Sequence, residues 1–185
     1  RFPFALFVLA LAFVALIFAM MQDAFGEGWL AGLGRAAFAA GGIAVFAAAM
    51  WFDIRDRLRV TRLSECGFWL HLVAAPMFVH ALLLSDDSHS PGLPMVFGTM
   101  IALSLVALLI DRRALLVAGL GYVAAAISDL VSSSAAMFGL EFASTAVLLG
   151  LVLVVLALGW TPLRARLLRA VPFEGLKAKL PPAAA

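Results

Sequence analysis

Three ionisable side chains lie deep inside long apolar stretches of the sequence, where a charge is costly unless it is paired or used. They are Arg35, His80 and Asp129. Counted at the helical rise per residue from the ends of these stretches, all three fall at a similar depth in the outer third of a membrane. An arginine–carboxylate pair beside a histidine could bind a ligand or exchange protons, so the pattern predicts a polar intramembrane site.

Two simpler interpretations of the same residues stay open. Arg35 and Asp129 could form a structural ion pair that, together with a hydrogen-bonded His80, locks three helices to one another. Alternatively, Arg35 could extend its guanidinium group to the nearby membrane surface and take no part in a site.

The two histidines of one apolar stretch, His71 and His80, do not form a shared metal or haem site. Nine residues apart on a helix, they are separated by half a turn and face opposite sides. No cofactor is therefore expected, and a haem-binding redox subunit is the weakest alternative function. Pro76 lies between the two histidines, and because it lacks an amide hydrogen it predicts a kink that could act as a hinge.

Neither a metal site nor a catalytic site is expected. Asp86, Asp87 and His89 lie close together, but this cluster is short and lacks a recognised ligand spacing. The sequence has no Gly-x-Ser-x-Gly motif, no phosphate-binding glycine loop and no His-Glu-x-x-His motif. No lysine lies within an apolar stretch, which excludes a retinal Schiff base. We therefore expect that the chain is not an enzyme.

The densest charged region is residues 52–65, directly after the second apolar stretch. Its charges have mixed signs, which favours a folded network of ion pairs over a simple patch for anionic lipids. Asp53 and Asp56 are expected to pair with arginines of the same loop. The loop would then set the topology through local salt bridges, and the alternative is a docking surface for a cytoplasmic partner or lipid head groups.

Six apolar stretches of nearly membrane-spanning length carry these residues. The chain is 65% hydrophobic and only 13% charged, and no water-soluble fold of this size could bury so much apolar surface. Backbone polar groups must be paired internally in lipid, so each stretch is expected to form a helix. The expected helices are residues 2–21, 29–52, 67–84, 93–110, 114–131 and 140–160.

The basic residues predict the orientation of these helices. Twelve of the 13 Lys and Arg flank the apolar stretches on one side, which the positive-inside rule places in the cytoplasm. The sequence therefore predicts an all-α, polytopic bundle of six transmembrane helices with both ends in the cytoplasm. The transmembrane domain is residues 1–160, and residues 161–185 form a cytoplasmic tail whose short amphipathic helix begins at Pro162.

Residues 52–83 also contain a recognisable series of motifs. The series reads Phe52-Asp53-x-x-Asp56, Thr61-Arg62-x-Ser64, Phe68-Trp69-Leu70-His71-Leu72-x-Ala74-Ala75-Pro76 and Val79-His80. It resembles a stretch in uncharacterised bacterial inner-membrane proteins, mostly alphaproteobacterial, and this resemblance implies no particular activity. What it does imply is a bacterial inner membrane and a shared role for a set of five residues that join the inner loop to the third helix: Asp53, Asp56, Arg62, His71 and His80.

The small size and sparse intramembrane chemistry favour a non-enzymatic accessory or structural subunit of a bacterial inner-membrane complex. Its expected partners are the lipid bilayer and other membrane proteins or further copies of the chain, and nucleic acid is not among them. The alternative is a small, proton-coupled transporter or channel that uses the polar site of Arg35, His80 and Asp129.

Overall fold

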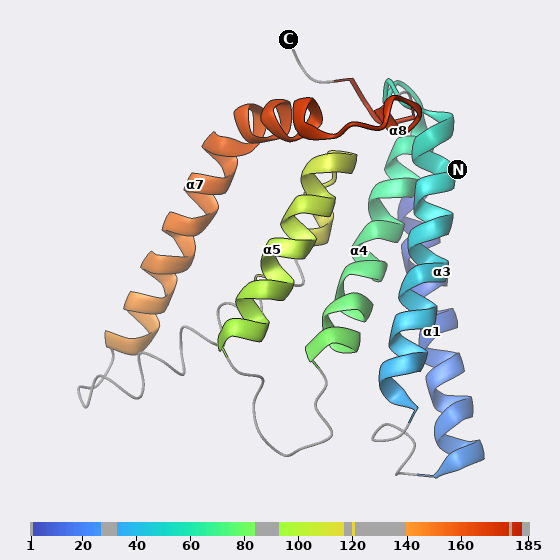
Figure 1. Ribbon diagram of the computed structural model, residues 1–185. Coiled ribbons are helices and arrows are strands. Elements are labelled where there is room, and N and C mark those ends of the chain that lie inside the picture. The colour runs from blue at the N-terminus through green and yellow to red at the C-terminus, as the bar shows by residue number, and fades with distance from the viewer. Residues whose placement is uncertain are drawn as a thin grey trace.

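A computed structural model describes residues 2–26, 33–83, 93–116, 120, 140–177 and 179–182. These residues are mainly helical and contain no strand, so the expected all-α class is confirmed for this part of the chain. Figure 1 shows α1, α3, α4 and α5 side by side, with α7 on the far side of α5. The helices found in the described ranges are α1 (Pro3–Phe25), α3 (Gly34–Arg55), α4 (Arg62–Leu83), α5 (Leu93–Ile110), α7 (Leu140–Ala170) and α8 (Glu174–Lys177).

Three of these helices, α1, α3 and α4, are long and apolar enough to cross a membrane. The prediction of transmembrane helices is confirmed to this extent. The expected helix over 114–131 lies mostly outside the described residues, as do Asp86, Asp87, His89 and Asp129.

Helix ends depart from the ends of the apolar stretches where polar residues can continue or begin a helix. α5 has the expected bounds, whereas α4 begins at Arg62 and not at Gly67. The hydroxyl oxygen of Thr61 accepts a hydrogen bond from the backbone N–H of Leu63 (3.2 Å), so Thr61 caps the helix before its apolar part begins. At the other end of the bundle, α1 runs on to Phe25 and stops at Gly26, which has a positive φ of 74°.

The C-terminal amphipathic segment is the continuation of α7 and not a separate helix. α7 passes through Pro162, and Figure 1 shows it bending so that its last turns cross the end of the bundle. Proline removes one helical hydrogen bond and crowds the carbonyl four residues earlier, which bends a helix without ending it. The prediction that a new helix begins at Pro162 was therefore wrong, although its position across the end of the bundle agrees with an interfacial segment.

α3 and α4 form the closest helix pair among the described elements. Gly41 and Gly42 of α3 face Met77 of α4, and Gly67 of α4 faces Asp53 of α3, so small residues let the two backbones approach. α1 rests on α4 through Phe4 and Phe7 against Trp69, with ring centroids 5.0 and 5.3 Å apart. None of the residues of α1 is buried, so most of its apolar surface faces outward.

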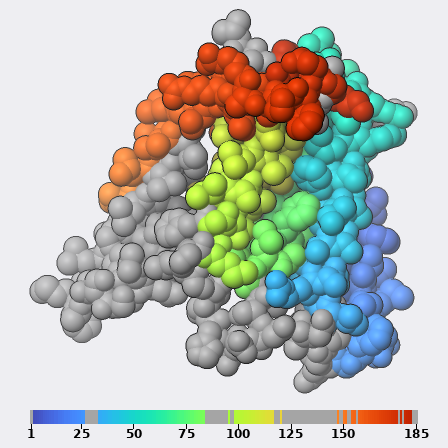
Figure 2. Space-filling view, in the orientation of Figure 1, coloured from blue at the N-terminus to red at the C-terminus, as the bar shows by residue number. Residues whose placement is uncertain are grey.

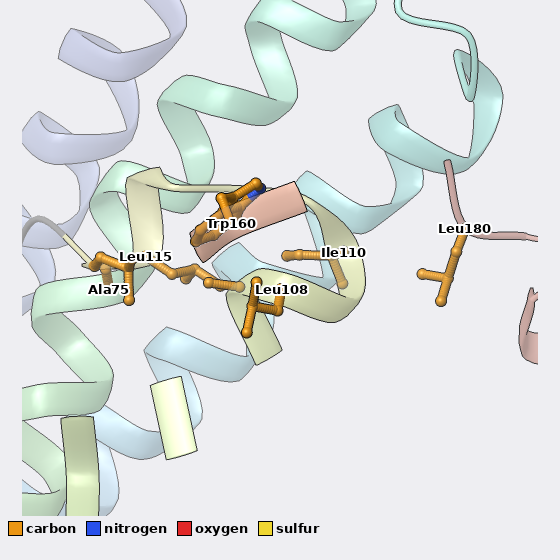
Figure 3. Packing of buried hydrophobic residues seen from close by; sticks show 8 residues of the cluster. Ala75, Leu108, Ile110, Leu115, Trp160 and Leu180 are labelled. Atoms are coloured by element: carbon orange, nitrogen blue, oxygen red, sulfur yellow. The ribbon is translucent and has the colours of Figure 1, made fainter. Parts of the chain in front are cut away.

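The buried hydrophobic cluster lies towards the end of the bundle at which α7 crosses. Figure 3 shows Trp160 close to Leu108 and Leu115, which come from three different segments. Leu180 belongs to the same cluster and is only 3% exposed. In Figure 2 the last turns of α7 and the following chain form a layer over this end. The core therefore ties the C-terminal segment to α5 and to the chain just after it.

Candidate functional site: a buried ion-pair network at one end of the bundle

We call the end of the bundle that carries residues 53–65, 111–113 and 160–182 the basic end. Its centre is Asp53, which is buried in the last turn of α3. Nε2 of His71 lies 3.0 Å from Oδ2 of Asp53, and Nε of Arg112 donates to the same oxygen at 2.9 Å. An Nη nitrogen of Arg112 donates to Oδ1. The two-point contact is the geometry in which an arginine and a carboxylate pair most strongly.

Arg112 extends the network from Asp53 to the first turn of α4. Its Nη2 also donates to the backbone carbonyl and to the hydroxyl of Ser64, both at 3.0 Å. Arg112 follows α5, and its side chain is buried. One guanidinium group therefore joins the ends of α3, α4 and α5.

His71 is the fully buried member of the network. It has 0% exposure, and the ring of Phe46 lies against it with the centroids 5.2 Å apart. An ionised carboxylate can only accept hydrogen bonds. Nε2 of His71 is therefore protonated and donates the hydrogen bond to Asp53. Nδ1 has no hydrogen-bond partner among the described residues. Metal-binding histidines often bond a carboxylate in this way, but no three His, Cys, Asp or Glu side chains of the described chain come together.

A second ion pair links the loop after α3 to the end of α5. Nη1 of Arg59 lies 2.9 Å from Oδ2 of Asp111, and Nη2 donates to the carbonyls of Ile110 and Asp111. Arg59 and Asp111 both have a positive φ, 55° and 57°, which costs free energy in a residue with a side chain. The N–H of Arg112 reaches back to the carbonyl of Ala107 at 2.8 Å, so Asp111 occupies the left-handed position of a helix C-cap.

Asp111 also anchors α7. Nε1 of Trp160 donates to Oδ1 of Asp111 at 2.8 Å, and Nε of Arg164 lies 3.7 Å from the same oxygen.

Burial lowers the pKa of Arg59, and the nearby positive charge of Arg112 lowers it further. The negative charges of Asp111 and Asp53 raise it. The guanidinium nevertheless stays charged at neutral pH, because an arginine begins from a very high value.

The last residues of the described chain are fixed by two arginines. Arg57 donates from Nε and Nη2 to the carbonyl of Leu180, at 3.1 and 2.9 Å. Arg164 donates to the carbonyls of Pro181 (2.6 Å) and Pro182 (3.0 Å). The segment after α7 is thereby fastened over the loop between α3 and α4.

Asp56 folds the loop between α3 and α4. Its carboxylate accepts the backbone N–H groups of Val60 (3.1 Å) and Thr61 (2.9 Å) and the hydroxyl of Thr61 (2.7 Å). The hydrogen bond from the Thr61 hydroxyl is the main cause that holds the pKa of Asp56 below its ordinary value of 3.8. The loop therefore depends on an ionised Asp56.

Asp56 is expected to make the stability of the protein sensitive to acid. A carboxyl group with a lowered pKa in the folded state stabilises the protein above its unfolded pKa, and this contribution is lost as the pH falls through the folded value. The difference in unfolding free energy between the wild type and Asp56→Asn should therefore be constant at neutral pH and shrink below about 3.8. Unfolding in mixed micelles at a series of pH values measures it, and a difference that persists unchanged into strong acid would contradict the assignment.

Two of the three residues predicted to form the outer polar site, Arg35 and His80, lie towards the opposite end of α3 and α4. Nε of Arg35 is 3.4 Å from the carbonyl of Ala81, next to His80 in the chain. Nδ1 of His80 donates to the carbonyl of Pro76 (2.8 Å), and its ring stacks on Phe38. The structure thus places Arg35 and His80 on neighbouring helices, while Asp129 lies outside the described residues. α4 continues through the predicted hinge at Pro76.

The set of residues implied by the motif resemblance is only partly brought together. Asp53 and His71 bond directly, and His71 is fully buried within the protein. Arg62 is exposed at the start of α4, and His80 lies near the other end of the same helix. The expected pairing of both aspartates with arginines of their own loop was wrong, because Asp53 pairs with Arg112 and Asp56 bonds to backbone N–H groups and Thr61.

Several residues of the network were missed from the sequence. From the sequence, Arg112 and Arg164 count only among the basic residues that flank the helices, and no role is assigned to Asp111 or Trp160. The one available signal was Asp111 itself, a carboxylate at the end of an apolar stretch beside two arginines. Comparisons with protein-family models, with curated proteins and with solved structures found no match to this chain.

Proposed function

We propose that the chain is a non-enzymatic accessory or structural subunit of a bacterial inner-membrane complex, with six transmembrane helices and both ends in the cytoplasm. The observation that carries the proposal is the network centred on Asp53. Its charged groups bond to one another across helices, and these contacts fix the relative positions of α3, α4 and α5. A catalytic carboxylate would instead need an open face towards a substrate.

The outward apolar surface supports the same proposal. α1 has no buried residue, and its exposed side chains include Leu9 (66%) and Phe13 (62%). α3 and α7 add Ile43 (61%) and Leu158 (78%). A helix with so few contacts inside its own chain has surface available for lipid and for a partner helix.

Site-specific photocrosslinking in native membranes tests this proposal. A photoreactive benzoylphenylalanine at Phe13, Ile43 or Leu158 is expected to capture a second polypeptide, because these side chains face outward. The same label at Phe7, which packs against Trp69, is the matched control and should crosslink within the chain. A second copy of the chain as the captured partner would identify a homo-oligomer. Lipid adducts alone at all three outward positions would refute the subunit proposal.

A small proton-coupled transporter or channel is the second candidate. It is favoured by a cavity of about 250 Å³ between α1, α3 and α4 that both Pro76 and His80 border. Proton uptake into proteoliposomes, followed with an internal pH dye, is the measurement. A carrier should lose uptake in His80→Gln and Asp129→Asn while Glu174→Gln, at the other end, retains it. Equal and negligible uptake in all three proteins and the wild type would remove this candidate.

A further inference from the structure

At the basic end, most of the carboxylates are bonded within the chain, whereas most of the cations are exposed to solvent. Asp53, Asp56 and Asp111 all accept hydrogen bonds from within the chain, and Asp53 and Asp56 are buried. The exposed cations that the structure describes there outnumber the exposed carboxylates by seven to two. They are Arg55, Arg57, Arg62, Arg113, Arg166, Arg169 and Lys179, against Glu65 and Glu174. The outward charge of this end is therefore positive, and the partner that fits it is an anion.

Two arginine–tryptophan pairs indicate the depth of this end in a bilayer. The guanidinium of Arg55 lies 3.6 Å from the ring centroid of Trp51, and that of Arg113 lies 5.1 Å from that of Trp160. Tryptophan favours the level of the lipid head groups. Trp51 is itself half exposed (49%). In a membrane these pairs place cationic groups at the level of the lipid phosphates.

A groove opens at the same end between the beginnings of α1 and α4. It has a volume of about 400 Å³ and is lined by Phe2, Pro3, Thr61, Arg62, Leu63 and Cys66. Most of this lining is apolar, and Arg62 is the cation among its described residues. Beside it, Phe4, Phe7 and Phe68 surround Trp69. A mainly apolar groove with a guanidinium group suits an amphiphile with a negative head.

We propose that this groove binds an anionic phospholipid, with the phosphate at Arg62 and the beginning of an acyl chain against Phe2 and Leu63. Arginine binds phosphate oxygens through its planar fork of donors. Asp56 holds the backbone at Thr61, so the backbone that carries Arg62 is fixed at the edge of the groove. An acidic polypeptide shares the charge, but the level set by the tryptophan pairs favours lipid. This site is independent of the proposed function.

Cys66 provides a reporter for the groove, because it is the one cysteine of the chain and lines the groove. Its rate of alkylation by a maleimide is measured in nanodiscs of phosphatidylcholine with and without phosphatidylglycerol. We expect the anionic lipid to slow alkylation roughly fivefold, the effect of one favourable arginine contact. The surface-charge control is Leu163→Cys in a Cys66→Ser background, an exposed position at the same end whose rate should change little.

Matched variants separate the groove from the general charge of the surface. Arg62→Gln should abolish the protection of Cys66, Arg62→Lys should keep most of it, and Arg166→Gln, which removes the same charge elsewhere, should leave it intact. Each variant must first give a monodisperse helical protein. Protection that survives Arg62→Gln, or that is lost equally in Arg166→Gln, overturns the proposal.

The remaining arms distinguish the sources of the anion. Inorganic phosphate added to the detergent-solubilised protein should not protect Cys66, and equal protection by phosphate would overturn the lipid assignment in favour of a free anion. Protection that occurs in native membranes but not in phosphatidylglycerol nanodiscs would identify a polypeptide occupant and would equally overturn it.

Discussion

Replacing Arg112 by glutamine is expected to lower the free energy of unfolding by about 3–5 kcal/mol, because the carboxylate of Asp53 would stay buried without its cation. Arg112 makes both of the arginine contacts to Asp53 and two further bonds to Ser64. His71 alone cannot replace them, since it reaches only Oδ2. Reversible unfolding in mixed micelles, followed by far-ultraviolet circular dichroism, gives the free energies.

Arg113 is the matched control for this experiment. It is the next residue in the chain and carries the same charge, but it is exposed and lies over the ring of Trp160. Arg113→Gln should therefore change the free energy of unfolding by no more than about 1 kcal/mol. Similar losses for the two arginines would mean that net charge, and not the contact to Asp53, governs the effect.

A double-mutant cycle isolates the pair itself. Asp53→Asn removes the buried negative charge, so Arg112→Gln should cost less in that background than in the wild type. The expected coupling between the two sites is about 0.5–3 kcal/mol. Strictly additive losses would show that Asp53 and Arg112 stabilise the protein independently.

The apolar helices could be predicted because their signal is local. Apolar length and the need to pair backbone groups in lipid act on each stretch separately, and α5 has the bounds that its apolar stretch predicts. Helix ends were less predictable. The beginning of α4 depends on the cap at Thr61, and the bend of α7 at Pro162 depends on what its last turns pack against.

The network at the basic end could not be predicted, because its partners are far apart in the sequence. Asp53 and Arg112 are separated by 59 positions, and Arg59 and Asp111 by 52. Asp53 has Arg55, Arg57 and Arg59 closer to it in the chain. Proximity in the sequence would make one of these three arginines the partner of Asp53. The packing of α5 beside α4 instead brings Arg112 to it. A count of charges at helix ends predicts the orientation but not which cations become buried.

Replacing Gly67 by alanine is the second substitution with a large expected effect, because Asp53 occupies the space of the missing side chain. A Cβ at this position would overlap Oδ1 of Asp53, and it would also come within 3.4 Å of the backbone carbonyl of Ala49. A carboxylate without hydrogen-bond partners could rotate away from the new Cβ. The carboxylate of Asp53 cannot do so without losing its hydrogen bonds to Arg112 and His71. Gly67→Ala should cost about 1–3 kcal/mol from crowding alone, and more where Asp53 loses its partners.

Two comparisons decide whether the crowding acts through the network. A Cβ at Gly98 of α5 would meet nothing within 4 Å, so Gly98→Ala should be neutral or stabilise the helix by up to about 1 kcal/mol. In an Asp53→Ala background the carboxylate is gone, and Gly67→Ala should become nearly neutral. Gly67→Ala could instead lower the free energy of unfolding equally with and without the carboxylate. The glycine would then be required by the close approach of the α3 and α4 backbones, and not by the position of Asp53.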